Sequence, residues 1–249
     1  MPCTGFFLRG CHASTAKHPG LALTARWPLA RLAFLAAAAK MAGMYPGERF
    51  NAWSHLVGAV FALTGATWLI VTASLRADAQ AITSVAIYGT VMVLLYAIST
   101  VYHSVRGRAK RILRKCDHLS IYLMIAGSYT PFCLISLRGA WGWSLFGVVW
   151  GLAVLGMLQE IKPRNAARVR SLVIYAVMGW VALVATDPLL QALGPAGFAW
   201  LAAGGALYSV GVVFFVLDGR VRHFHGIWHL FVIAGSLAHY VAVLRYVVP

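Results

Sequence analysis

The stretch AITSVAIYGTVMVLLYAISTVYH, residues 81–103, decides the fold of this chain. It contains no Lys, Arg, Asp or Glu, and a helix needs about 20 apolar residues to cross a membrane. Its apolar character is continuous, whereas a strand of a membrane barrel alternates apolar and polar positions. This stretch therefore predicts a membrane-spanning α-helix.

Six further stretches have a similar length and the same continuous apolar character. One such run is compatible with a buried helix of a soluble protein, but seven runs are not. We therefore predict an all-α, polytopic membrane protein, a bundle of seven transmembrane helices at residues 55–75, 81–103, 119–137, 141–161, 171–189, 197–217 and 226–248.

The composition of the 249 residues agrees with this prediction. Hydrophobic residues make up 61% of the chain and charged residues 11%, whereas about 25% of residues are charged in a soluble domain. So few charged side chains cannot cover a surface that faces water. The composition excludes a soluble enzyme, a disordered tail protein and a collagen-like fibre. The four cysteines have no spacing typical of a disulfide framework.

The basic residues predict the direction of insertion. Lys and Arg number 21 against six Asp and Glu, a formal net charge of +15. In a seven-helix topology only Arg76, Arg138 and Arg245 fall on one side, and all other basic residues fall on the side of the N-terminus. Cytoplasmic loops are enriched in Lys and Arg, so we expect a cytoplasmic N-terminus and an external C-terminus. We also expect the basic loops to contact anionic lipid headgroups, and we expect no nucleic-acid partner.

The first part of the chain differs from the rest, because its apolar run at residues 32–39 is too short to span a membrane. Three interpretations stay open. These residues form a disordered or misassigned start, with Met41 and Met44 as alternative beginnings, an interfacial amphipathic segment, or a cleaved signal peptide. We divide the chain into an N-terminal extension, residues 1–44, and a membrane domain, residues 45–249.

Ionisable side chains within the predicted spans gather at one depth. Such side chains are costly in a membrane and are therefore candidates for function. The topology rests on Lys and Arg alone, yet it brings five other residues from four helices to the cytoplasmic end: His55, His103, Asp117, His225 and His229.

The spacing of His225 and His229 indicates metal binding. Residues at i and i+4 lie on one face of a helix, where two imidazoles can hold one ion, although histidines at this spacing are more often structural. A third nitrogen from His103 would complete the open three-ligand arrangement typical of catalytic zinc. Neutral imidazoles suit zinc better than calcium or magnesium.

Two neighbouring residues have alternative interpretations. Asp117 could accept a hydrogen bond from water at the zinc and act as a base, or it could form an ion pair with Arg114 or Lys115. The Ser99 hydroxyl lies one turn before His103 and could orient its imidazole, or it could bond to a carbonyl of its own helix. We select Asp117 and Ser99 as candidate catalytic residues.

Other polar residues are expected to be structural. We predict that His239 is a buried packing histidine and that Glu160 pairs with Lys162 at the membrane interface. A local kink is expected at residues 129–131, because the third of them is a proline. Gly127 is expected to let two helices approach closely.

Four sequence elements resemble motifs of a known family. Residues 48–55, ERFNAWSH, resemble its E-x-x-N-x-x-[ST]-H motif, and residues 99–103, STVYH, resemble its S-x-x-x-H motif. Asp117 and His118, followed by AGSYTP, resemble its third-span motif, and HGIWH at residues 225–229 resembles its H-x-x-x-H motif. On these elements the chain is identified as a member of the hemolysin III branch of the progestin and adipoQ receptor group, which includes the adiponectin receptors.

The resemblance implies a seven-helix membrane fold with a zinc ion, Zn2+, near the cytoplasmic leaflet. His103, His225 and His229 would be the zinc ligands. Asp117 would hold the water at the zinc, and Ser99 would support the site.

Two kinds of function follow. The first hypothesis is a zinc-dependent, ceramidase-like hydrolase of lipid amides or esters, with acyl chains that enter between the helices. The alternative is a non-enzymatic protein with a structural zinc, either membrane-perturbing and active in cytolysis or similar to a receptor or sensor. An ion conduit ranks last because ionisable residues are sparse. We expect a multi-pass protein of the cell membrane, the inner membrane in a bacterium, with membrane lipids as partners.

Overall fold

The computed structural model describes residues 44–45, 47–76, 78–161 and 167–248. All described residues belong to one compact unit, which lies within Lys40–Pro249. The predicted extension, residues 1–44, lies outside the described residues except for Met44, so its three interpretations stay predictions.

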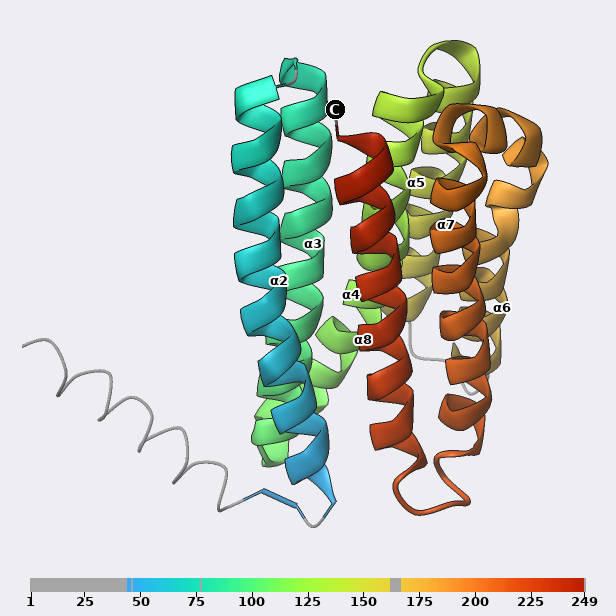
Figure 1. Cartoon of the computed structure of the whole chain (residues 1–249). Helices are drawn as coiled ribbons and strands as arrows, with labels where there is room; N and C mark the ends of the chain where they lie inside the picture. Colours follow the sequence, from blue (N-terminus) through green and yellow to red (C-terminus); the bar gives the residue numbers. More distant parts are fainter. Residues whose placement is uncertain (1–43, 46, 77, 162–166, 249) are drawn as a thin grey trace, which may run out of the picture. The chain divides into compact units, whose positions relative to one another are not determined.

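Every regular element that the structure describes is helical, as the sequence predicts (Figure 1). Short π-helical or 3₁₀ segments follow three of the α-helices, at Phe132–Leu137, Val181–Ala185 and Val243–Val247. The α-helices are α2 Glu48–Arg76, α3 Ala79–Ser104, α4 Gly107–Pro131, α5 Gly139–Ile161, α6 Ala167–Trp180, α7 Thr186–Leu217 and α8 Phe224–Ala242.

Six helical stretches in the described part of the chain are long and apolar enough to cross a membrane, where the sequence predicts seven. The difference arises in one place. The predicted fifth and sixth spans, residues 171–189 and 197–217, belong to a single stretch of 49 residues, Val169–Leu217. A straight helix of this length would extend about 73 Å, more than twice the thickness of the hydrocarbon core of a bilayer.

This long stretch is interrupted at Gly194, where φ is 66° and ψ is 170°. Glycine adopts a positive φ without the steric cost that a side chain would add. Pro195 follows, and proline disfavours a helical backbone in the residue before it. Figure 1 shows that the chain reverses direction between α6 and the main part of α7. The stretch therefore consists of two arms, which explains why the sequence contains two apolar runs here.

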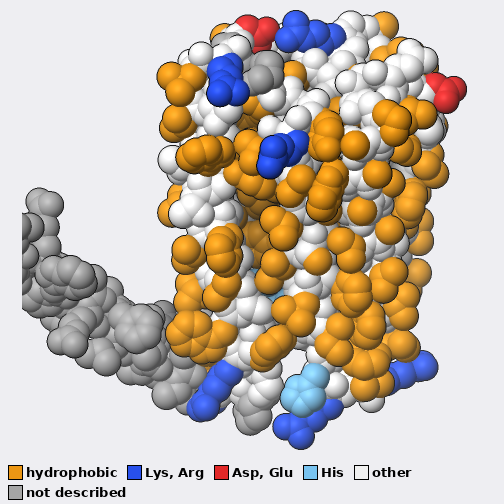
Figure 2. Space-filling view, viewed as in Figure 1, with side chains coloured by type: hydrophobic (Ala, Val, Ile, Leu, Met, Phe, Trp, Pro, Cys, Tyr) orange, Lys and Arg blue, Asp and Glu red, His pale blue; other side chains and the backbone are white. Residues whose placement is uncertain are grey.

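The outer surface of the described helices is apolar. Phe61, Trp68 and Leu155 are 70%, 63% and 62% exposed. Figure 2 shows hydrophobic side chains over most of the visible face, with Lys and Arg mainly toward its two ends. Such a surface suits the acyl chains of a bilayer and not water.

The sequence predicts a span that starts at residue 119 and places the basic residues before it in a connection. In the structure these basic residues are helical instead, since they belong to α4, which begins at Gly107. Lys and Arg are good helix formers, so they extend α4 beyond its apolar part. These residues are Arg108, Lys110, Arg111, Arg114 and Lys115.

The proline of the third predicted span changes the helix type. Helix α4 ends at Pro131, and the π-helical segment Phe132–Leu137 continues from it. Proline lacks a backbone N–H and its ring clashes with the preceding turn, and a wider π turn is one way to accommodate this. The change lies where the sequence predicts a kink.

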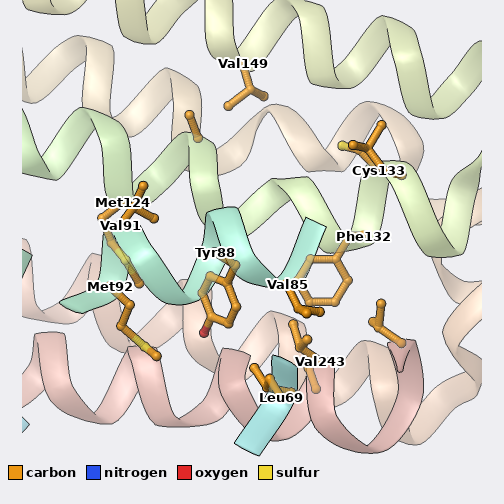
Figure 3. Packing of buried hydrophobic residues seen from close by; sticks show 14 of the residues in the cluster. Leu69, Val85, Tyr88, Val91, Met92, Met124, Phe132, Cys133, Val149 and Val243 are labelled. Atoms are coloured by element: carbon orange, nitrogen blue, oxygen red, sulfur yellow. The ribbon is translucent and has the colours of Figure 1, made fainter. Parts of the chain in front are cut away.

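Apolar side chains from several helices pack in one core cluster (Figure 3). Small residues allow close contact between these helices. Gly127 of α4 packs directly against Val91 of α3, as predicted, and Gly156 of α5 packs directly against the ring of Tyr122. A Cβ atom at either glycine would overlap its neighbour, so these positions require glycine for packing.

The start of α3 is held by Asp78. Its carboxylate accepts a hydrogen bond from the Ala81 backbone N–H at 2.8 Å, as a helix N-cap does. The side chain of Arg138 donates to the same carboxylate at 3.2 Å. The Ala81 amide holds the pKa of the Asp78 carboxyl below its usual range, so the cap is ionised at neutral pH.

We expect opposite effects from the same substitution at two positions of α5. Gly156→Ala should lower the free energy of unfolding by roughly 1–3 kcal/mol, because the ring of Tyr122 is fully buried and cannot move away. Gly147 has open space around it, so Gly147→Ala should stabilise the helix by about 0.5–1 kcal/mol. Thermal unfolding in one detergent compares them, and equal stability of the two variants would contradict the packing.

Candidate metal centre

Three histidines from two helices that are distant in the sequence meet at one end of the described helices. His103 lies near the end of α3, and His225 and His229 lie one turn apart at the start of α8. One potential ligand atom from each of them lies within 4.8 Å of the others. The sequence predicts this group of three from its spacing and depth, and the structure brings its members together.

Hydrogen bonds settle which nitrogen of each ring is available. The Nδ1 atom of His103 contacts the carboxylate of Glu48, and the Nδ1 of His225 lies 2.8 Å from Oδ2 of Asp218. A carboxylate only accepts hydrogen bonds, so both Nδ1 atoms carry a proton, and in the neutral ring each Nε2 atom then carries a lone pair. These Nε2 atoms are buried and have no hydrogen-bond partner within the described part of the chain.

The third ring follows the same pattern. The Nδ1 of His229 donates to the backbone oxygen of Asn51 at 3.2 Å and lies 3.3 Å from Oγ of Ser54. Its Nε2 is therefore also the acceptor nitrogen. The ring stacks on His55, with ring centres 3.6 Å apart and an angle of 12° between the planes. Helix α2 thus fixes the orientation of a histidine that belongs to α8.

This arrangement fits a metal ion. Ligand histidines commonly donate their second N–H to a carboxylate or a backbone carbonyl, which sets the tautomer and the ring orientation. Three neutral imidazoles form a donor set for a transition metal and not for calcium or magnesium. His103, His225 and His229 could therefore hold a metal ion through their Nε2 atoms.

The sequence alone does not reveal the roles of Glu48 and Asp218. Glu48 begins α2, and its second oxygen accepts a hydrogen bond from Lys110 at 3.0 Å. Asp218 directly follows α7, and the positive φ of 71° at His223 turns the chain into α8. The only signal for Glu48 was its place in the quoted motif, and no signal indicated Asp218.

The candidate catalytic residues lie beside the cluster. Asp117 comes from α4, and its carboxylate is within hydrogen-bonding reach of the Ser99 hydroxyl of α3. Both residues line the same cavity as His225 and His229. Asp117 and Ser99 thus lie beside the histidine cluster and within reach of each other, and their catalytic roles stay predictions.

The cavity has a volume of about 370 Å³, within the range typical of small-molecule sites. It extends along α8 from His229 to His239, ten residues or about 15 Å farther along the helix axis. Apolar and aromatic side chains form most of its remaining wall, among them Leu95, Ile121, Met124, Leu172, Trp180, Val212 and Val232.

His118, which also lines this cavity, belongs to a second polar group. The Nδ1 of His118 lies 3.0 Å from Oε1 of Glu160, and the Ser171 hydroxyl donates to Oε2 of Glu160 at 2.7 Å. The predicted pair of Glu160 with Lys162 stays a prediction, because Lys162 lies outside the described residues. The carboxylate points toward α4 and α6, and a sequence does not show this rotation about the helix axis.

The fold and the histidine cluster define a class of protein: a multi-pass helical membrane protein with a three-histidine site that could hold a metal ion beside an internal cavity. The chain belongs to the haemolysin-III related family, whose model matches residues 44–240. This confirms the resemblance seen in the four sequence motifs.

Individual relatives agree with this assignment. The chain is 41% identical over 203 residues to Hemolysin-3 of Bacillus cereus, which covers 81% of this chain and 92% of the relative. It is 40% identical over 202 residues to the Hemolysin-3 homolog of Bacillus subtilis (strain 168), covering 81% and 94%. The human monocyte to macrophage differentiation factor is 33% identical over 167 residues, covering 64% and 68%.

We expect the purified protein to contain about one transition-metal ion per chain, and His225→Ala to lose it. Removal of one of three ligands leaves too few donors for tight binding. The matched control is His118→Ala, which removes a histidine of the same cavity that lies outside the cluster. Elemental analysis of both variants makes the comparison. Equal metal content in the two would show that the cluster does not hold the metal.

Proposed function

We propose that the protein is a zinc-dependent hydrolase of lipid amides or esters that acts near the cytoplasmic leaflet. One observation carries the proposal: buried imidazoles with available Nε2 atoms lie beside a carboxylate at the polar end of an apolar cavity. Three protein ligands with one open position are typical of catalytic zinc.

The residues of the chain have distinct tasks in this proposal. Glu48 and Asp218 hold two of the histidine rings so that Nε2 faces the ion. Bound zinc would supply Lewis-acid chemistry, which activates water and polarises a carbonyl. Asp117 accepts a proton from the attacking water and passes it to the leaving amine or alcohol. The Ser99 hydroxyl donates to the carboxylate of Asp117 and fixes its orientation.

The substrate class follows from the surroundings of the site. The cavity is lined largely by apolar side chains, and the outer surface is apolar as well. An acyl chain from the bilayer can therefore enter between the helices while its polar head stays at the histidine cluster. Anionic headgroups would contact the basic start of α4.

The topology that we propose has seven crossings, with the N-terminus in the cytoplasm and the C-terminus outside. The reversal near Gly194 supports it, because each arm of Val169–Leu217 then crosses once. The distribution of basic residues supports the orientation. Figure 1 agrees with an odd number of crossings, because α2 begins at the end of the bundle opposite to the C-terminus.

A second candidate is a non-enzymatic membrane-perturbing or receptor-like protein in which zinc joins α3 to α8. The names of the relatives favour it, since one is a hemolysin and another a differentiation factor. In this case removal of the metal would lower the unfolding temperature of the protein, and no lipid would be turned over.

We expect the zinc-loaded protein to release fatty acid from a ceramide or a monoacylglycerol in mixed micelles. Asp117→Asn should lower the rate by a factor of about 10²–10⁴ while it keeps its zinc. The matched control is Asp78→Asn, the same substitution at the opposite end of α3, which should leave the rate unchanged. Absence of turnover in the loaded wild type, or full turnover in a zinc-free His225→Ala/His229→Ala variant, would refute hydrolysis.

The seven-crossing topology makes a separate prediction for cysteine labelling. In a chain whose four cysteines are replaced by Ala, Arg138→Cys and Gln191→Cys should react with an impermeant maleimide added to intact cells. Arg222→Cys should react only after the cells are lysed. If Val169–Leu217 crossed only once, Arg222→Cys would react from outside, contrary to the proposal.

A further inference from the structure

The far end of the cavity contains a further buried imidazole with an available nitrogen. His239 is 9% exposed, and its Nε2 lies 3.1 Å from the backbone oxygen of Leu201. A carbonyl only accepts, so Nε2 carries the proton and Nδ1 is an acceptor. This Nδ1 is buried without a hydrogen-bond partner among the residues that the structure describes, which is unfavourable in the interior of a membrane protein.

The ring of His239 is held in place on several sides. Gly204 packs directly against it, so closely that a Cβ atom at this position would overlap the ring. The rings of Tyr208 and Phe132 make edge contacts, with centroid distances of 5.5 and 6.5 Å. The imidazole therefore cannot turn freely to bring Nδ1 to another protein group. His239 lines two cavities, so a molecule bound in them is a source for the missing donor.

Two cavities meet at this histidine. The cavity of about 370 Å³ leads from the histidine cluster to His239, and a smaller cavity of about 90 Å³ is lined by the same residue. The wall of the smaller cavity is mainly apolar, and includes Phe132, Leu145, Leu183, Leu189 and Phe198. Cavities with apolar walls do not favour water.

The order of the histidine cluster, the two cavities and His239 indicates what kind of molecule would fit. A polar head fits the histidine cluster, an apolar chain fits the larger cavity, and an apolar chain end fits the smaller one. Between them the Nδ1 of His239 requires a hydrogen-bond donor, about 15 Å from the level of His229 along α8. A plain acyl chain has no donor at this position, but a chain with a hydroxyl group does.

We propose that His239 recognises a hydroxyl group in the middle of an acyl chain, and that it thereby selects hydroxylated acyl lipids. This inference deepens the proposed function, because it takes the polar head of the lipid to lie at the histidine cluster. The hydroxyl donates to Nδ1, and Nε2 keeps its bond to Leu201. His239 is then a specificity-determining residue and takes no part in bond cleavage.

The test uses binding and not turnover. Stearic acid and its hydroxy derivatives, with the hydroxyl at successive positions along the chain, are titrated into the purified full chain in nanodiscs. We expect one mid-chain position to bind about fivefold to tenfold more tightly than stearate, the gain from one net hydrogen bond. Hydroxyl groups near the carboxylate should give no gain. A flat series for the wild type would overturn the proposal.

Two variants that keep an aromatic ring show which residue causes the tighter binding of the mid-chain hydroxy acid. His239→Phe keeps a ring but has no nitrogen, and should bind every member of the series about as tightly as stearate. Tyr208→Phe removes a different polar group of the same cavity and should keep the mid-chain optimum. Loss of the optimum in Tyr208→Phe alone would assign the recognition to the tyrosine. The preference for a mid-chain hydroxyl does not depend on hydrolysis. If the protein shows this preference but turns over no lipid, only the proposed hydrolase function is refuted.

Discussion

The structure depends on one constraint: three imidazole rings, two of them buried and the third partly exposed, lie together inside a membrane protein with their Nε2 atoms left as acceptors. Leaving such atoms unpaired in a medium of low dielectric constant is unfavourable, so a shared cation is the simplest compensation. The carboxylates of Glu48 and Asp218 give the rings this tautomer. They come from the start of α2 and from the residue after α7, and they bind rings of α3 and α8. Correct folding of four helices is therefore needed to form a single site.

Much of this was predictable from the sequence, because the membrane simplifies the problem. The length and continuity of the apolar runs indicate helices, and the stretch at residues 81–103 forms α3 almost to the residue. The basic residues assign a side to each connection, and this placed His103, His225 and His229 at one depth. Depth and i,i+4 spacing indicate His225 and His229 and offer His103 as a third donor, and the family motifs imply that these three form the site.

The rest could not be predicted, because it depends on rotation about helix axes and on backbone detail. A sequence does not show that Glu48 faces His103, that Asp218 folds back onto His225, or that Glu160 faces His118. The number of spans differs for a local reason, since the positive φ at Gly194 separates two arms inside one long helical stretch. The acceptor nitrogen of His239 also became evident only when its bond to Leu201 was known.

X-ray absorption spectroscopy at the zinc edge of the purified protein tests the central claim most directly. Three imidazole ligands should give nitrogen scattering at about 2.0–2.1 Å with the outer-shell pattern of histidine rings, and this pattern should fit three rings per zinc. Scattering from sulfur at about 2.3 Å, or zinc with oxygen ligands alone, would contradict the account, since the metal would then lie away from the three histidines.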